Sequence, residues 1–222
     1  MKNFNLAIDG PAGAGKSTIA KRIARELGFI YVDTGAMYRA MALYFLRNQI
    51  DAAETVKIED ACKNVNVTID YKDGEQFVLL NGENVNGLIR TEEVGNMASA
   101  TSVNKTVRLK LVELQQLLAK RESVVMDGRD IGTFVLPDAD LKIYLTASSK
   151  ERARRRWAEL KEKGVAADIE LIEKDILERD RRDMTREFAP LKQAEDAVYL
   201  DTSAMTIDEV VAKIIQLVRN KL

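Results

Sequence analysis

The sequence predicts an α/β protein in which a five-stranded parallel sheet has helices on both faces. Three observations predict it. Short apolar runs alternate with segments of helical periodicity along most of the chain. A glycine-rich stretch joins the first apolar run directly to the first helical segment. A central stretch changes to the two-residue period of antiparallel strands, which predicts an inserted β subdomain.

The parallel layer begins at residues 5–9, an apolar run that stops at Gly10 and has the length of a buried strand. After the glycine-rich stretch, apolar residues recur at helical spacing as far as Leu27, and Gly28 stands where a C-cap glycine is common. The same patterns predict the other elements of this layer, which are strands at 29–32, 123–126, 141–145 and 197–200 and helices at 36–47 and 207–218.

The inserted subdomain is predicted within about residues 62–90. Apolar and polar residues alternate in the first of three short runs, and a turn signal separates each run from the next. The runs lie at 65–69, 77–80 and 83–86, and the turns lie at Asp73–Gly74 and Asn81–Gly82. This pattern predicts a three-stranded antiparallel meander, which helices up to about residue 121 join back to the parallel layer.

The composition excludes several kinds of site. The chain of 222 residues has no histidine, which excludes histidine triads, histidine-ligated metals and histidine general bases. Its 34 lysines and arginines nearly balance 35 acidic residues, so no basic field indicates a nucleic-acid partner. Cys62 is the single cysteine and can form no internal disulfide, which suits a reducing compartment.

Nothing in the pattern of the chain indicates a membrane. No apolar run approaches the roughly 20 residues that a transmembrane helix needs, and Asp9 comes too early for a signal peptide. We therefore expect a cytoplasmic protein with neither a membrane nor a nucleic-acid partner. Because no long heptad pattern is present, we also expect a monomer.

The glycine-rich stretch matches the phosphate-loop pattern G-x4-G-K-[ST]. It consists of Gly10, Pro11, Ala12, Gly13, Ala14, Gly15, Lys16 and Ser17, followed by Thr18. Backbone N–H groups of such a loop surround phosphate oxygens at the start of a helix. Lys16 would reach the β- and γ-phosphates of ATP, and Ser17 would offer its hydroxyl to Mg²⁺. The alternative is a glycine-rich turn with an exposed lysine, but the strand before it and the helix after it favour a fold of the P-loop NTPase type.

The apolar strand at 123–126 leads directly to Asp127, as in the acidic strand of many P-loop proteins. A carboxylate at this place can help to hold Mg²⁺, directly or through water. The alternative is that Asp127 caps a helix.

Two groups of charged residues recur at helical spacing. The first is Arg152, Arg155 and Arg156, and the second is Arg179, Arg182, Asp183 and Arg186. Residues at i, i+3, i+4 and i+7 share one helix face. Arginines on such a face suit the charge of a transferring phosphoryl group. The alternative is a solvated face of paired charges, such as Glu178-Arg179-Asp180.

Three segments together resemble the bacterial cytidylate kinases. They are Asp33-Thr-Gly-Ala-Met-Tyr-Arg39, Asp127-Gly-Arg-Asp-Ile-Gly-Thr133, and Glu178-Arg-Asp-Arg-Arg-Asp183 with the Arg186 and Ala189-Pro-Leu191 that follow. The resemblance implies transfer of the γ-phosphate of ATP to CMP or dCMP, with Mg²⁺ as cofactor. It also implies a core at about 1–35, 122–148 and 185–222, an NMP-binding region at about 36–121 and a short lid at about 149–175.

The resemblance implies roles for individual residues. The cytosine ring would be read by Ser99, Arg108 and Asp130. The acceptor phosphate would be held by Arg39, Arg129 and Arg186. The sugar would contact Arg179 and Asp183, and Thr34 would contact the base or the sugar. The lid arginines Arg152, Arg155 and Arg156 would close on the phosphates, Arg152 on ATP. Phosphoryl transfer itself would depend on Lys16, Arg129, Arg155, Arg156 and Arg186.

Each of these roles has a simpler alternative. Arg108 and Ser99 could be helix-surface residues, and Asp130 could be a turn carboxylate that pairs with Arg129. Asp183 could form an ion pair within its own helix, with Arg179 or Arg182.

Other functions remain open to a phosphate loop alone. The nearest is a kinase of the same fold with another acceptor, such as UMP, AMP or a metabolite. A second is an ATPase that acts on protein or nucleic acid, and a third is a nucleotide-binding module without chemistry. The guanine motif N-K-x-D of GTPases is not matched. The segment Asn104-Lys105-Thr106-Val107 comes nearest, but its last residue is valine where the motif has aspartate.

Overall fold

The elements along the chain alternate as the sequence predicts, and the chain divides into two units. The computed structural model describes residues 3–72 and 75–222. One unit runs as far as Tyr31 and resumes from Glu122 to Leu222, and the other is Val32–Arg121. We call them the first and the second unit, and we describe each by itself. The turn expected at Asp73–Gly74 lies outside the described residues.

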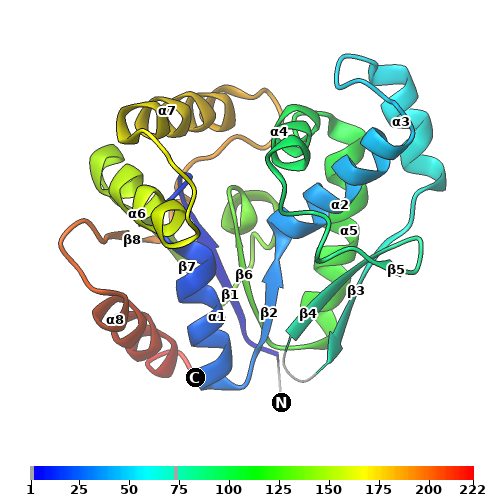
Figure 1. Ribbon diagram of the computed structural model, residues 1–222. Helices are drawn as coiled ribbons and strands as arrows, with labels where there is room; N and C mark the ends of the chain where they lie inside the picture. Colours follow the sequence, from blue (N-terminus) through cyan, green and yellow to red (C-terminus); the bar gives the residue numbers. More distant parts are fainter. Residues whose placement is uncertain (1–2, 73–74) are drawn as a thin grey trace. The chain divides into compact units, whose positions relative to one another are not determined.

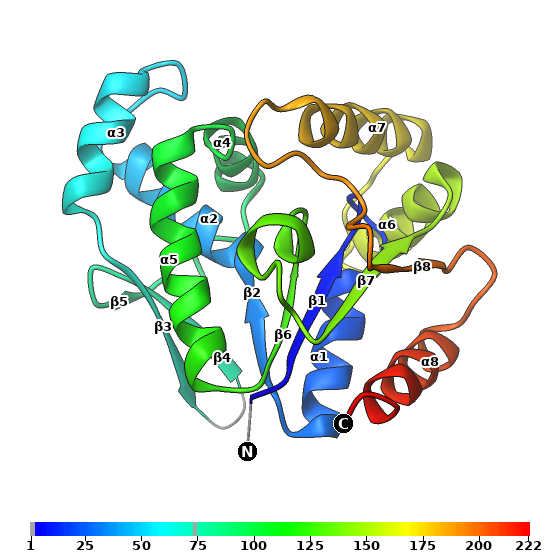
Figure 2. The same cartoon turned by 180° about the vertical axis from the view of Figure 1, so that it is seen from behind.

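A five-stranded sheet forms the centre of the first unit (Figure 1). Its strands are β1 (Asn5–Asp9), β2 (Ile30–Asp33), β6 (Val124–Gly128), β7 (Leu141–Thr146) and β8 (Val198–Asp201). The division falls within β2, whose last two residues are counted with the second unit. Their order is β2-β6-β1-β7-β8, and Figure 2 shows β1 between β6 and β7 from behind. The strands β6 and β7 flank β1 in parallel, with Asp9 in register with Gly128 and with Tyr144. The prediction of a five-stranded parallel sheet with helices is confirmed.

Four helices accompany this sheet among the described residues of the first unit. They are α1 (Lys16–Leu27), α6 (Ser149–Glu162), α7 (Ile169–Thr185) and α8 (Ile207–Arg219). The first ends where the sequence predicts, because Gly28 adopts the left-handed conformation (φ 69°) and donates its N–H to the carbonyl of Ala24. The last begins with a reciprocal capping box between Thr206 and Glu209.

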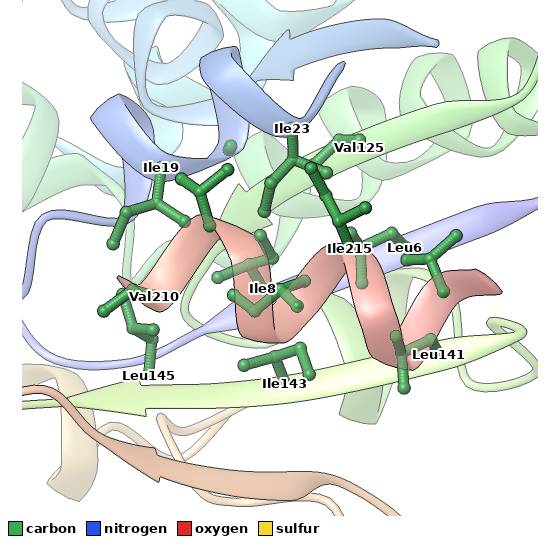
Figure 3. Packing of buried hydrophobic residues seen from close by; sticks show 14 of the residues in the cluster. Leu6, Ile8, Ile19, Ile23, Val125, Leu141, Ile143, Leu145, Val210 and Ile215 are labelled. Atoms are coloured by element: carbon green, nitrogen blue, oxygen red, sulfur yellow. The ribbon is translucent and has the colours of Figure 1, made fainter. Parts of the chain in front are cut away.

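The main core of the first unit lies between α1, α8 and one face of the sheet (Figure 3). Since side chains alternate along a strand, Leu6 and Ile8 of β1 point into this core. Ile23 of α1 and Ile214 of α8 meet them there, fully buried. The opposite face of β1 carries Asp9, beside a short π-helix, η1 (Ile131–Val135), which the sequence analysis did not predict.

The second unit contains the predicted antiparallel meander. Its strands are β3 (Val67–Lys72), β4 (Glu75–Leu80) and β5 (Glu83–Asn84), paired in that order. Its helices are α2 (Thr34–Arg47), α3 (Thr55–Asn64), α4 (Glu92–Thr101) and α5 (Lys105–Arg121). The predicted start of β3 at residue 65 is wrong, because Val65 caps the C-terminus of α3.

The start of α2 also differs from the prediction, and its cause is local. The helix begins at Thr34 instead of residue 36, because the Asp33 side chain accepts a hydrogen bond from the N–H of Ala36 at 2.9 Å. In the part of the chain that the structure describes, no helix combines the length and the apolar character needed to cross a membrane.

Candidate active site

The carboxyl ends of the parallel strands carry the residues that the sequence singled out. In open α/β sheets, ligands bind outside these ends. The register places Ile8 beside Asp127 and Thr146 beside Asp201, so the loops after β1, β6, β7 and β8 leave the same edge of the sheet. The glycine-rich loop leaves β1 at this edge, at Gly10.

The backbone of the glycine-rich loop explains its glycines. A Cβ atom at Gly10 would lie only 1.9 Å from the carbonyl oxygen of Leu145, so no other residue fits there. Gly15 adopts the left-handed conformation (φ 86°) immediately before α1 begins at Lys16. The loop therefore ends at a helix N-terminus, as a phosphate site requires. Within it Ala12 and Ala14 are buried, whereas Thr18 lies exposed on α1.

Lys16 lies inside the loop and not on the surface. Its side chain is buried, and its Nζ donates a hydrogen bond to the carbonyl of Pro11 at 2.7 Å. Burial and the positive charges of Arg129 and Arg179 hold the pKa of Lys16 well below its usual range. An anion placed among these positive groups would relieve their repulsion, which is what a phosphate-binding site needs. The alternative of an exposed lysine is wrong.

Ser17 and Asp127 meet as a Mg²⁺ site would require. The Ser17 hydroxyl donates to Asp127 Oδ2 at 2.9 Å, and the Tyr31 hydroxyl donates to Oδ1 at 2.8 Å. Mg²⁺ in kinases keeps several waters and takes one or two protein oxygens together with substrate phosphates. A hydroxyl beside a carboxylate at the phosphate loop fits this requirement. Tyr31 was not predicted, and its position next to Asp127 across the sheet could not be found from spacing.

The three arginines of α6 that the sequence analysis singled out take different positions. Arg152 is buried, and its Nη1 donates to the carbonyl of Ala12 at 2.7 Å. Arg155 is half-buried, and its Nη1 would lie 4.0 Å from a Cβ at Gly15. Arg156 is exposed and pairs with Glu159 at 2.8 Å. The structure therefore brings Arg152 and Arg155 to the loop, and Arg156 shows the solvated pairing that was the alternative.

A second charged cluster joins the end of α7 to the segment after β6. Arg129 Nε donates to Asp183 Oδ2 at 2.8 Å, and Arg186 Nη2 donates to Asp130 Oδ1 at 3.1 Å. These partners differ from the sequence alternatives, which paired Asp130 with Arg129 and Asp183 with residues of its own helix. Burial raises the pKa of Asp183, but the charges of Arg129, Arg179 and Arg186 outweigh it and hold that pKa below its usual value.

One expectation about this cluster is wrong. Arg186 does not continue the helical face of Asp183, because α7 ends at Thr185 and Arg186 has an extended backbone. Its Nε donates to the carbonyl of Ala189 at 2.6 Å, so the loop after the helix holds its side chain. Arg179, by contrast, lies on α7 and is exposed.

In the second unit, Arg108 is the clearest departure from the surface alternative. Its side chain on α5 is only 1% exposed, and its guanidinium lies 5.4 Å from the ring centroid of Tyr38. Its Nη1 also donates to the carbonyl of Ser102 at 3.1 Å. A charged group is buried in this way only where specific partners surround it. Ser99 lies half-buried on α4.

The other two residues expected in the second unit are at the start of α2. Thr34 is buried, and Arg39 Nη2 lies 3.3 Å from Asp33 Oδ2. Arg90, which the sequence analysis did not single out, reaches the same oxygen at 2.8 Å. Asp33 thus gathers two arginines while it caps the helix.

Two buried carboxylates of the first unit were missed. Asp9 accepts hydrogen bonds from the N–H groups of Ile131 at 2.8 Å and of Gly132 at 2.7 Å. Asp180 accepts one from the N–H of Ala12 at 2.8 Å. The sequence analysis named Asp180 only within a segment of the family resemblance and, as the alternative, within a solvated face of paired charges. A signal was present, because Ile176, Asp180 and Asp183 share the i, i+4, i+7 spacing of a buried face.

The chain as a whole is similar to known proteins. A family model described as cytidylate kinase matches residues 6–220. A cytidylate kinase of Caldicellulosiruptor saccharolyticus is 54% identical over 98% of this chain and 96% of its own length. Among solved structures, an uncharacterized protein from Eubacterium ventriosum has a TM-score of 0.57 at 13% identity, over 99% of both chains. A gluconokinase from Sinorhizobium meliloti has a TM-score of 0.50 at 15% identity, over 98% of this chain and 94% of its own. The likeness to these two structures concerns the fold alone.

Proposed function

The chain belongs to the cytidylate kinase family, and we propose that it transfers the γ-phosphate of ATP to CMP or dCMP at the site around its phosphate loop. One observation carries the proposal. Lys16 is buried inside a loop of backbone N–H groups at the start of α1, beside the paired Ser17 and Asp127. This arrangement suits a nucleoside triphosphate, because phosphate oxygens would meet fixed donors and positive charge without reorganisation.

We propose that ATP is held by the loop from Gly10 to Thr18, with Mg²⁺ at Ser17 and Asp127. The metal would neutralise charge on the β- and γ-phosphates when it is bound. Arg155 lies beside Gly15, where its charge can contribute to the same end. We assign Arg156 a weaker part, since it is exposed and paired with Glu159.

The transfer needs alignment and charge neutralisation more than proton transfer. A phosphate oxygen of CMP is already an anionic nucleophile, so the chain needs no general base, and the absence of histidine costs nothing. Lys16 would stabilise the charge that develops on the transferring group, and Arg129 and Arg186 would neutralise the acceptor phosphate. The ion pairs of these arginines with Asp183 and Asp130 fix the orientation of both guanidinium groups.

For the acceptor, we propose that Asp130 accepts from the cytosine amino group and that Arg108 donates to the ring acceptors. Ser99 would contact the base and Arg39 the phosphate. Arg179 and Asp183 would contact the sugar, and Thr34 the base or the sugar. Uracil presents the opposite donors and acceptors on the same edge, so it would leave buried polar groups unpaired.

The test is an acceptor panel. Purified protein is mixed with Mg-ATP, and ADP formation is timed with CMP, dCMP, UMP, AMP, GMP or no acceptor. We expect fast turnover with the cytidine nucleotides and little without an acceptor. Equal turnover of UMP would contradict the account of base recognition, and ATP consumption that ignores every acceptor would make the protein an ATPase.

Two further proposals concern the state of the protein in the cell. We propose that it acts as a monomer in the cytoplasm, because its single cysteine suits a reducing compartment and no pattern for self-association is present. Light scattering at micromolar concentration tests the first, and cell fractionation tests the second.

A further inference from the structure

Two buried side chains of opposite charge hold one residue of the phosphate loop from both sides. Asp180 on α7 accepts the N–H of Ala12 through Oδ1 at 2.8 Å. Arg152 on α6 donates to the carbonyl of Ala12 through Nη1 at 2.7 Å. The two side chains also pair with each other, Nη1 to Oδ2, at 2.5 Å. We call these three residues the loop clamp.

The buried charges of Asp180 and Arg152 are balanced by each other and by further hydrogen bonds. Each of the two charged side chains is only 7% exposed, and a buried ion pair stabilises a structure only if further hydrogen bonds satisfy it. Both oxygens of Asp180 have partners, and Arg152 Nε donates in addition to the carbonyl of Ala147 at 2.9 Å. Removing either charge would leave the other buried and without its ionic partner.

Close packing accompanies the hydrogen bonds. A Cβ atom at Gly13 would lie 3.2 Å from Arg152 Cβ and 3.4 Å from Ile176 Cδ1. Helices α6 and α7 therefore both rest against the loop at this point, one residue beyond Ala12. The glycine is required here for that approach as well as for its left-handed backbone (φ 74°).

We infer that Asp180, together with Arg152, is a positioning residue that ties the phosphate loop to α7, so that the donor phosphates are aligned with the acceptor residues on that helix. Asp183 lies one turn further along α7, and Arg186 follows its end. A shift of α7 relative to the loop would displace these residues from the transferring group. The inference rests on the proposed function, and it changes the expected role of Arg152 from a ligand of ATP to a support of the loop.

The clamp is tested by steady-state kinetics and by binding of a non-hydrolysable ATP analogue. Asp180→Ala removes both contacts of the carboxylate, whereas Asp180→Asn keeps an acceptor for the Ala12 N–H but loses the charge. Because a misplacement of about 1 Å can cost about 100-fold in rate, we expect kcat with CMP to fall by about 10- to 100-fold in Asp180→Ala. The dissociation constant of the ATP analogue should change less than about threefold, since the loop amides remain.

Three further variants and a check of folding separate a loss of positioning from a general loss of stability. Asp175→Asn removes a charge from the exposed face of the same helix and should leave kcat and the melting temperature unchanged. Arg152→Met should match Asp180→Ala, and the double variant should be little slower than either single one, because both act through one clamp. Circular dichroism and thermal melting must show each variant folded at the assay temperature.

The outcomes are distinguishable. A wild type that phosphorylates no nucleoside monophosphate would overturn the proposed function. A wild type that does so, with an Asp180→Ala variant of unchanged kcat, would overturn only the clamp. Multiplicative losses in the double variant, or an ATP-analogue affinity that falls as much as kcat, would also overturn it and return Arg152 to a direct contact with ATP.

Discussion

The two units of the chain hold their buried charges in different ways. In the first unit, buried carboxylates accept hydrogen bonds from other residues of the candidate site, Asp127 from Ser17, Asp180 from Ala12 and Asp183 from Arg129. In the second unit, Arg108 lies against the ring of Tyr38, and Asp33 pairs with two arginines at the start of α2. Substitutions in the first unit should therefore affect catalysis through several partners at once, whereas those in the second should act locally.

The largest effect is expected at the centre of the first unit. Lys16→Met removes the charge that would face the phosphates in the proposed reaction, and loss of one such group costs about 100- to 1,000-fold in kcat. The melting temperature should not fall, because burial of this charge opposes folding and methionine fills similar space. Lys213→Met, an exposed change on α8, is the matched control and should leave kcat unchanged. A Lys16→Met variant with normal kcat would refute the donor site.

Two glycines, one in each unit, test how closely the chain packs around them. Gly10→Ala places a Cβ 1.9 Å from the carbonyl oxygen of Leu145, and the strain should lower the free energy of unfolding by about 3 kcal/mol or more. Gly95 lies in α4 of the second unit, with nothing within 4 Å of a Cβ. Gly95→Ala should raise stability by about 0.5–1 kcal/mol, because alanine favours a helix. Urea unfolding of both variants measures this, and a stable Gly10→Ala would show that the strand ends can separate.

Asp9 is a buried carboxylate of the first unit that accepts hydrogen bonds from two backbone N–H groups. Burial raises the pKa of Asp9 to about 6, against the opposing hydrogen bonds from Gly132 and Ile131. The folded protein thus binds a proton more tightly than the unfolded chain, and the stability present at low pH is lost as pH rises through about 4 to 6. Relative to Asp9→Asn, the wild type should lose about 2 kcal/mol of stability from pH 4 to pH 7.

The measurement is urea unfolding of both proteins across that range. The difference between the two curves isolates Asp9, because the other carboxylates cancel in it. Parallel curves would mean that Asp9 keeps an ordinary pKa and that water reaches it.

The smallest effect is expected in the second unit. Arg108→Met removes a charged donor, and hydrogen bonds to charged groups are worth about 1.5–3 kcal/mol, so kcat/KM for CMP should fall about 10- to 100-fold. The KM for ATP should not change, because the phosphate loop belongs to the first unit. Initial rates with each substrate varied check this, and a parallel rise in the KM for ATP would show that the two units do not act separately. Lys110→Met, the next residue but one on α5, is the control.

Local patterns in the sequence predicted much of the fold. The five parallel strands, the meander and the end of α1 at Gly28 could be predicted, because each depends on neighbours within a few residues. The start of β3 and the continuation of α7 to Arg186 were wrong by one or two residues. There a cap residue ends the helix, and its position depends on backbone hydrogen bonds that periodicity does not report.

By itself, the sequence determined the phosphate loop and its place between β1 and α1, because eight consecutive residues carry that chemistry. Only the tertiary structure decided which charges are buried. For Asp180 and Arg108 a surface position was the alternative, since a charged residue is usually exposed and helical spacing does not show what covers a face. Asp180 meets Ala12 across 168 residues of sequence, and Arg108 meets Tyr38 from another helix. The free energy of burying a charge depends on such distant partners, which appear only when the chain is folded.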